Sequence, residues 1–161
     1  MTAAEYARQI QAELEEYWLP LIYRDRILKL RTRSYQFGRL NHRARVDIQH
    51  TLLGVELKVG RRRLLCPDLA TARYLSVFAR LGCQKVAIPY DITKISELAD
   101  QLESSWYRML LLADYRAANE SERFRNRIRA LLKARVLEEV IEAGAGTEVP
   151  EFKQSTKQRS T

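Results

Sequence analysis

The chain has 161 residues and a formal net charge of +8, with 46% hydrophobic and 30% charged residues. This length and balance are typical of one folded domain rather than a disordered chain. No apolar run approaches the ~20 residues of a membrane span, and no signal peptide opens the chain. The two cysteines, Cys66 and Cys83, provide no disulfide framework. Secreted and membrane-spanning classes are therefore disfavoured, and we expect a cytoplasmic protein.

The first half of the chain shows the periodicity of one helix followed by several strands. A helix is expected from about residue 2 to residue 18, stopped by Pro20. The strands, recognised by alternation of apolar and polar residues, are expected at residues 28–33, 45–49 and 54–59. Gly60 marks a hairpin turn into a short fourth strand at residues 63–66.

The second half predicts a helix, one strand and two further helices. Pro67 and Asp68 open the first of these helices, which ends before Gly82. The apolar run at residues 86–88 predicts a strand covered on both faces and parallel to an earlier strand. The last two helices are expected to begin at Asp91 or Thr93, and at Asn119 with Glu122 as a capping box.

The predicted fold is therefore a single mixed α/β domain over residues 1–146. Its small mixed sheet follows the order helix–strand–strand–strand–helix–strand, and a pair of helices ends the domain. Residues 147–161 are polar and are expected to form a flexible tail.

The positive charge is concentrated in three stretches. Residues 24–45 hold eight Lys or Arg and one acid, residues 61–63 are all arginine, and residues 116–135 hold seven Lys or Arg and two acids. Such clustering indicates a polyanionic partner, either nucleic acid or an acidic protein surface. The alternative is that these residues form ordinary solvated faces.

The first two basic stretches supply the candidate nucleic-acid contacts. These are Arg31, Arg33, Arg39, Arg43, Arg61, Arg62 and Arg63. Arginine suits bidentate phosphate contacts, and it suits protein carboxylates as well. Tyr35 and Phe37 lie in the same region, where their rings could stack on bases or serve as core residues beneath a charged edge.

Three polar side chains could converge on one face of the predicted sheet. Asp47 lies on the polar side of one strand, and Glu56 and Lys58, two residues apart, share a side of the next. Two carboxylates can hold Mg²⁺ and so activate water, and a lysine can stabilise charge on a phosphate. The alternative is an ordinary cross-strand pair on the wet face, worth under ~1 kcal/mol.

The element order, with VDI around Asp47 followed by VELKV around Glu56 and Lys58, resembles the PD-(D/E)XK nuclease core over about residues 3–90. The resemblance implies Asp47 and Glu56 as ligands of Mg²⁺, Lys58 as the catalytic lysine, and phosphodiester hydrolysis. Residues 67–74 and 88–94 are also similar to segments of small cyanobacterial proteins, a likeness that implies no mechanism.

Two hypotheses follow from these patterns. The first is a protein that binds nucleic acid, with magnesium-dependent nuclease chemistry as its enzymatic form. The second is a non-catalytic assembly factor that docks an acidic partner through its arginines and forms a homo-oligomer through the C-terminal helices. Weaker candidates are a zinc site among His42, His50, Cys66 and Cys83, and activation of the Cys66 thiol by a helix N-terminus, against a role as a small buried hydrophobe.

Overall fold

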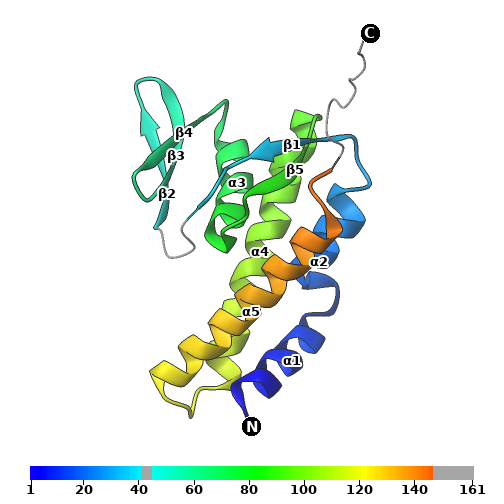
Figure 1. Cartoon of the computed structure of the whole chain (residues 1–161), viewed down its shortest axis with the longest axis vertical. Coiled ribbons are helices and arrows are strands. Elements are labelled where there is room, and N and C mark those ends of the chain that lie inside the picture. Colours follow the sequence, from blue (N-terminus) through cyan, green and yellow to red (C-terminus); the bar gives the residue numbers. More distant parts are fainter. Residues whose placement is uncertain (41–44, 147–161) are drawn as a thin grey trace.

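The computed structural model describes residues 1–40 and 45–146. The helices are α1 (Ala3–Leu14), α2 (Leu19–Ile22), α3 (Leu69–Leu81), α4 (Ile92–Arg116) and α5 (Glu122–Ala143), with a 3₁₀ turn at Glu15–Tyr17 and a π-helical turn at Tyr23–Ile27. The strands are β1 (Thr32–Gln36), β2 (Val46–Thr51), β3 (Gly54–Val59), β4 (Arg62–Cys66) and β5 (Lys85–Pro89). This mixed α/β content with C-terminal helices confirms the predicted fold class (Figure 1).

The strands gather at one end of the molecule and the long helices extend to the other (Figure 1). α1 packs against both α4 and α5 at the end remote from the strands. α3 lies between the β2–β3–β4 sheet and α5, and it contacts both. None of the described helices is both long and apolar enough to cross a lipid bilayer.

The strands form two antiparallel sheets instead of one mixed sheet. β1 pairs with β5, and β2, β3 and β4 form a separate sheet in that order. The predicted parallel pairing of β5 is wrong, because β5 pairs antiparallel with β1, and its second edge is bonded by side chains instead of by another strand. The Ala87 N–H donates to Tyr23 Oη at 3.0 Å, and the Tyr74 hydroxyl donates to the Ala87 carbonyl at 2.6 Å. Two tyrosines thus stand where a neighbouring strand would be.

The start of the chain also differs from the prediction. Pro20 does not stop a helix but lies in the first turn of α2, where its missing N–H has no cost. The chain then stays helical through Ile27, and β1 begins only at Thr32, so the strand predicted at residues 28–33 is displaced. Its alternating apolar residues, Leu28 and Leu30, pack at the edge of the core in a non-strand segment.

The caps explain where three of the helices begin and end. The Asp68 carboxylate accepts from the Thr71 N–H at 2.7 Å, so α3 begins just after Asp68, and Gly82 ends it in the left-handed conformation at φ 84°. Asp91 caps α4, as predicted. The predicted capping box at Asn119 is wrong, because Ser121 Oγ accepts from the Phe124 N–H at 3.1 Å.

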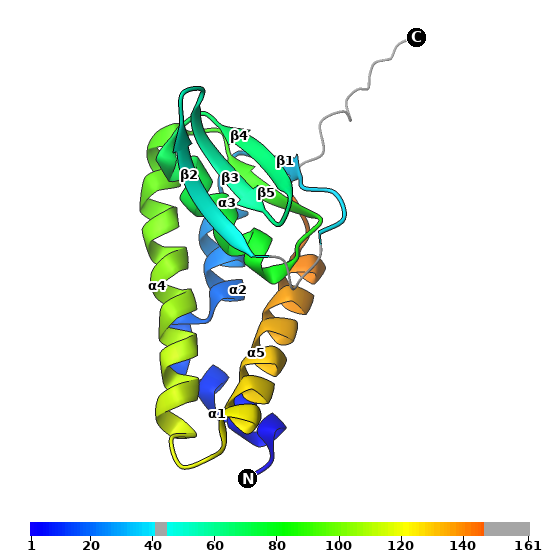
Figure 2. The same ribbon diagram turned by 90° about the vertical axis from the view of Figure 1, so that its left-hand side faces the viewer.

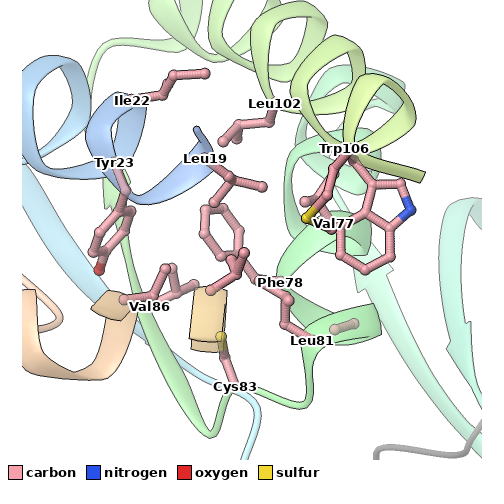
Figure 3. Packing of buried hydrophobic residues seen from close by; sticks show 14 of the residues in the cluster. Leu19, Ile22, Tyr23, Val77, Phe78, Leu81, Cys83, Val86, Leu102 and Trp106 are labelled. Carbon is pink, nitrogen blue, oxygen red and sulfur yellow. The ribbon is translucent and has the colours of Figure 1, made fainter. Parts of the chain in front are cut away.

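The core forms where α2, α3, α4 and β5 meet (Figure 3). Both cysteines are buried in it as free thiols. Cys66 is 4% exposed, and burial raises the pKa of its thiol, which favours the expected role of a small buried hydrophobe over an activated thiolate; burial raises the pKa of Cys83 to about 12. No group of three or more His, Cys, Asp or Glu among the described residues is placed to hold a metal ion, and His42 lies outside those residues.

The end of the described chain packs onto the β1–β5 sheet. The Tyr23 hydroxyl donates to the Gly144 carbonyl at 2.5 Å. At Gly146, φ is +79°, and a Cβ would lie 2.5 Å from Thr32 Oγ1 and 3.0 Å from Ala87 Cβ. Only glycine fits this contact. The predicted flexible tail at residues 147–161 lies outside the described residues.

Candidate nucleic-acid interface

The β2–β3–β4 sheet has one buried face and one open face. Leu57 and Val59 of β3 belong to the core, and α3 packs against β2 and β3. In Figure 2 this sheet lies in front of α3. Because side chains alternate along a strand, every second residue belongs to the face turned away from α3. The open face therefore presents Glu56 and Lys58 from the central strand.

Strand register brings the predicted catalytic residues onto this open face. Asp47 lies opposite Lys58, and Lys58 lies opposite Arg63. In the next row, Gln49 and Leu65 flank Glu56. Asp47 and Glu56 are thus diagonal neighbours on one face, at a Cα separation that is roughly 7–8 Å in antiparallel sheets.

Asp47 is already engaged by a neighbour. Its Oδ2 lies 3.1 Å from Arg45 Nε, and the two side chains are 44% and 88% exposed. An exposed ion pair of this kind contributes little to stability and exchanges readily with water. Asp47 can therefore change partners without a large energetic cost.

Glu56 is in a different situation, because it is buried although it lies on the open face. The residue is 9% exposed, and its Oε1 has no hydrogen-bond partner in the described part of the chain. Leaving a buried carboxylate oxygen without a partner is destabilising. Such an oxygen fits the preference of Mg²⁺ for carboxylate ligands, so Glu56 and Asp47 are compatible with a two-carboxylate site.

Unpaired cations gather at the end of this sheet that carries the β3–β4 turn. Lys58, Arg61 and Arg63 have no carboxylate partner among the described residues, and both arginines are exposed. We call these three residues the cationic end. Arg62 points elsewhere, since its Nη1 donates to the Phe37 carbonyl at 2.5 Å.

The other predicted arginines are more scattered. The Arg31 guanidinium lies 4.9 Å from the centre of the Tyr90 ring, and Arg33 and Arg39 are exposed on β1 and just after it. Arg43 lies outside the described residues. The strand register places Arg63 opposite Lys58, with Arg61 in the adjoining turn, whereas Arg31 contacts Tyr90 just after β5.

The aromatic residues of the first basic stretch are not free to stack on bases. Phe37 is 1% exposed and belongs to the core, so base stacking by this ring is wrong. Tyr35 is half-buried and packs edge-on against Phe37, with ring centres 5.1 Å apart. The core alternative is correct for Phe37.

Three of the seven cations in the third basic stretch are paired with the protein's own acids. Arg116 contacts Glu13 at 2.6 Å, Arg125 contacts Glu122 at 2.8 Å, and Arg129 contacts Asp114. These contacts tie α4 and α5 to each other and to α1. The sequence shows only that the stretch is basic, because two of these acids, Glu13 and Asp114, lie outside it.

The opposite end of the same sheet is apolar, a feature absent from the sequence-based predictions. Leu52 and Leu53 form the exposed β2–β3 turn, and Leu65 is 62% exposed beside Gly54. Because two leucines inside a two-residue turn cannot reach a core, the sequence itself indicates that Leu52 and Leu53 are exposed. The open face is thus charged near the β3–β4 turn and apolar near the β2–β3 turn.

Comparison with protein-family models, curated proteins and solved structures found no match for this chain.

Proposed function

We propose that the protein binds nucleic acid through the open face of the β2–β3–β4 sheet. The observation that supports this is the cationic end, where three cations without carboxylate partners among the described residues lie together at one end of an open sheet face, whereas Arg116, Arg125 and Arg129 of the third basic stretch are ion-paired. Unpaired cations on an open sheet face can replace the counterions of a phosphate backbone. Arg33 and Arg39, exposed on β1 and just after it, are further candidate contacts. The free buried cysteines suit a reducing compartment, so we propose a cytoplasmic location.

Salt dependence tests this proposal directly. For a short fluorescent duplex, the logarithm of the binding constant should fall linearly with the logarithm of the salt concentration. The slope should be near −0.9 for each phosphate neutralised. The triple variant Lys58→Gln, Arg61→Gln and Arg63→Gln should bind more weakly and lower the magnitude of the slope by up to roughly three. Fluorescence anisotropy across a salt series measures both quantities for DNA and for RNA.

A matched control removes the same charge elsewhere. Arg8 is exposed on α1, and Arg123 and Arg127 are exposed on the first turns of α5. α1 and the start of α5 lie at the end of the molecule remote from the strands (Figure 1). Their triple glutamine variant should keep the wild-type slope. Equal losses in both triple variants, or no binding by wild type at ~50 mM salt, would contradict the proposal.

An acidic protein partner is the competing explanation for the same surface. Both ligands need arginine contacts, but only nucleic acid has phosphates at regular spacing. Polyglutamate serves as the probe for the protein alternative. Stronger binding to polyglutamate than to either nucleic acid would favour the assembly factor, and assembly through the C-terminal helices would then be measured by light scattering.

Magnesium-dependent phosphodiester hydrolysis is a second candidate, favoured by the unpartnered Glu56 Oε1. Glu56 and Asp47 would hold the ion, which would lower the pKa of a bound water. Lys58, directly opposite Asp47, would stabilise negative charge on the phosphate. The residues are on one face as this chemistry requires.

A plasmid-nicking assay separates binding from chemistry. Wild type with Mg²⁺ should convert supercoiled plasmid to the open form, and Lys58→Ala and Glu56→Gln should each lose this activity. Arg63→Gln, which changes the cation opposite Lys58, is the control and should lower affinity more than turnover. Nicking that survives Lys58→Ala would contradict the nuclease candidate and leave nucleic-acid binding to stand on the salt series.

A further inference from the structure

A second cationic site lies on the other side of α3 from the proposed nucleic-acid face. α3 and α5 enclose a groove of about 510 Å³. Its polar lining comes from Arg80 at the end of α3 and from Asn126, Arg129 and Lys133 on α5. The spacing of these three α5 residues places them on one helix face, and Leu81 and Leu137 provide an apolar wall.

The three cations of this groove differ in their partners. Arg129 is already ion-paired, because it contacts the Asp114 carboxylate and lies 3.7 Å from Glu122 Oε2. Arg80 Nη1 reaches only Ser76 Oγ, at 3.5 Å. Within residues 1–40 and 45–146, neither Arg80 nor Lys133 has a carboxylate partner. Two positive charges in the groove are therefore not neutralised by the protein.

The pKa of Lys133 is affected by this excess of positive charge. Its ammonium lies 5.5 Å from the centre of the Trp106 ring, and the residue is only partly exposed. Burial lowers the pKa of Lys133, and the positive charges of Arg129 and Arg80 lower it further. A bound anion would reverse the second effect, because it would stabilise the protonated amine.

We propose that this groove binds an organic phosphate of about mononucleotide size. Arg80 and Lys133 would contact the phosphate oxygens, since arginine and lysine are the usual cations for this group. The amide of Asn126 supplies a further donor, and the wall formed by Leu81 and Leu137 covers the organic part. A groove of about 510 Å³ falls in the range of small-molecule sites, which run from roughly 300 to 1,000 Å³.

The phosphate could belong to a free mononucleotide or to the end of an oligonucleotide, and the groove chemistry is the same for both. The proposal does not depend on the function proposed for the sheet, because α3 separates the two surfaces. The ligands to compare are AMP, adenosine, inorganic phosphate and a short oligonucleotide with or without a 5′-phosphate. Adenosine tests whether the phosphate is required.

Amine-selective labelling of Lys133, read by mass spectrometry, tests the site. Bound AMP should raise the pKa of Lys133, and a pKa higher by one lowers the fraction of free amine about tenfold. Labelling of Lys133 should therefore slow by about that factor. Lys94, exposed on α4, is the internal reference and should label at an unchanged rate. Adenosine should not protect, and AMP should protect at a lower concentration than inorganic phosphate because the apolar wall adds contacts.

Variants separate this site from the sheet surface. Arg80→Gln should abolish protection of Lys133 by AMP, whereas Arg123→Gln, on the exposed part of α5, should leave it unchanged. The triple variant of the cationic end should also retain protection, even if it no longer binds nucleic acid. Protection only by the 5′-phosphorylated oligonucleotide would identify a strand end as the source, and protection by AMP would identify a free nucleotide.

Three results would overturn the proposal. The first is a Lys133 labelling rate that no phosphate compound changes. The second is protection by AMP that survives Arg80→Gln, which would place the bound phosphate elsewhere. The third is that AMP and inorganic phosphate protect Lys133 at equal half-protecting concentrations, which would show that the organic part of AMP makes no contact in the groove.

Discussion

The two sheets of this protein differ in how their strand edges are bonded and in how far their faces are covered. In the β1–β5 sheet, β5 is buried and its second edge is bonded by Tyr23 and Tyr74. In the β2–β3–β4 sheet, one face is open and carries the cationic end, an unpartnered carboxylate oxygen and exposed leucines. The second edge of β5 is thus bonded within the chain, whereas the open sheet leaves a buried carboxylate oxygen without a partner among the described residues. The contrast places bonding of a buried strand edge in the first sheet, and recognition by the second sheet is our proposal.

The largest expected effect comes from removing the tyrosine that bonds the β5 edge. Tyr23→Phe orphans the Ala87 N–H and the Gly144 carbonyl, which should lower the free energy of unfolding by roughly 2–4 kcal/mol. Urea denaturation followed by circular dichroism measures this loss. Tyr6→Phe is the control, because that hydroxyl donates only to Glu120 at 3.1 Å. Equal losses in the two variants would break the contrast between the sheets.

Alkaline pH tests the same hydroxyl without a substitution. Burial raises the pKa of Tyr23 to about 12, above its ordinary value of 10.0. The folded state therefore holds the proton more tightly, and this contribution is complete below pH 10 and lost as the pH rises toward 12. The loss should be roughly 2–3 kcal/mol. Tyr23→Phe should show a flatter stability curve over that interval, and parallel curves would contradict the assignment.

Gly146, which packs on the β1–β5 sheet, gives the next effect. Gly146→Ala should cost roughly 1–3 kcal/mol, because the added Cβ would overlap Thr32 Oγ1. Gly144→Ala has a similar positive φ of +99° but no atom within 4 Å of its Cβ position, so it isolates the backbone strain. Thermal unfolding of both variants separates overlap from strain. A Gly144→Ala loss as large as that of Gly146→Ala would contradict the packing argument.

On the open sheet, a substitution should stabilise the protein instead. Glu56→Leu removes a buried oxygen without a partner and should raise the free energy of unfolding by about 1 kcal/mol. Urea denaturation measures the gain, and the nicking assay reports any accompanying loss. Gln49→Leu, in the same row but exposed, is the control. A destabilised Glu56→Leu variant would show that the carboxylate supports the fold.

The smallest effect is expected at the cationic end. Arg61→Gln and Arg63→Gln should each change the free energy of unfolding by no more than about 0.5 kcal/mol, because both side chains are exposed and lack ion pairs among the described residues. Chemical denaturation at low salt measures this. A larger loss would assign these arginines to the fold rather than to a partner.

Local signals predicted much of the fold. The strand at residues 54–59, the end of α3 at Gly82 and the cap at Asp91 follow from alternation and from cap chemistry that neighbouring residues determine. The partner of β5 could not be predicted, because its edge is bonded by Tyr23, a residue 64 positions away. An apolar strand covered on both faces suggests a parallel sheet unless such side-chain bonds are known.

The candidate site was predictable to a similar degree. A period of two places Glu56 and Lys58 on one face, and the strand register adds Asp47 to it. The burial of Glu56 and the pairing of Arg116 with Glu13 depend on tertiary packing. Composition therefore located the basic stretches, but only the structure shows which of their charges are already neutralised.

The edges of the open sheet have a consequence for self-association. Among the described strands, β2 and β4 each pair on one side only, so both present unpaired main-chain groups. Arg62 and Arg63 begin β4, and positive charge on an edge strand opposes the approach of a second copy. Binding of nucleic acid would neutralise that charge and remove the repulsion. Strand-to-strand aggregation is thus expected to be most pronounced in the complex, at the point where phosphates just balance the arginines.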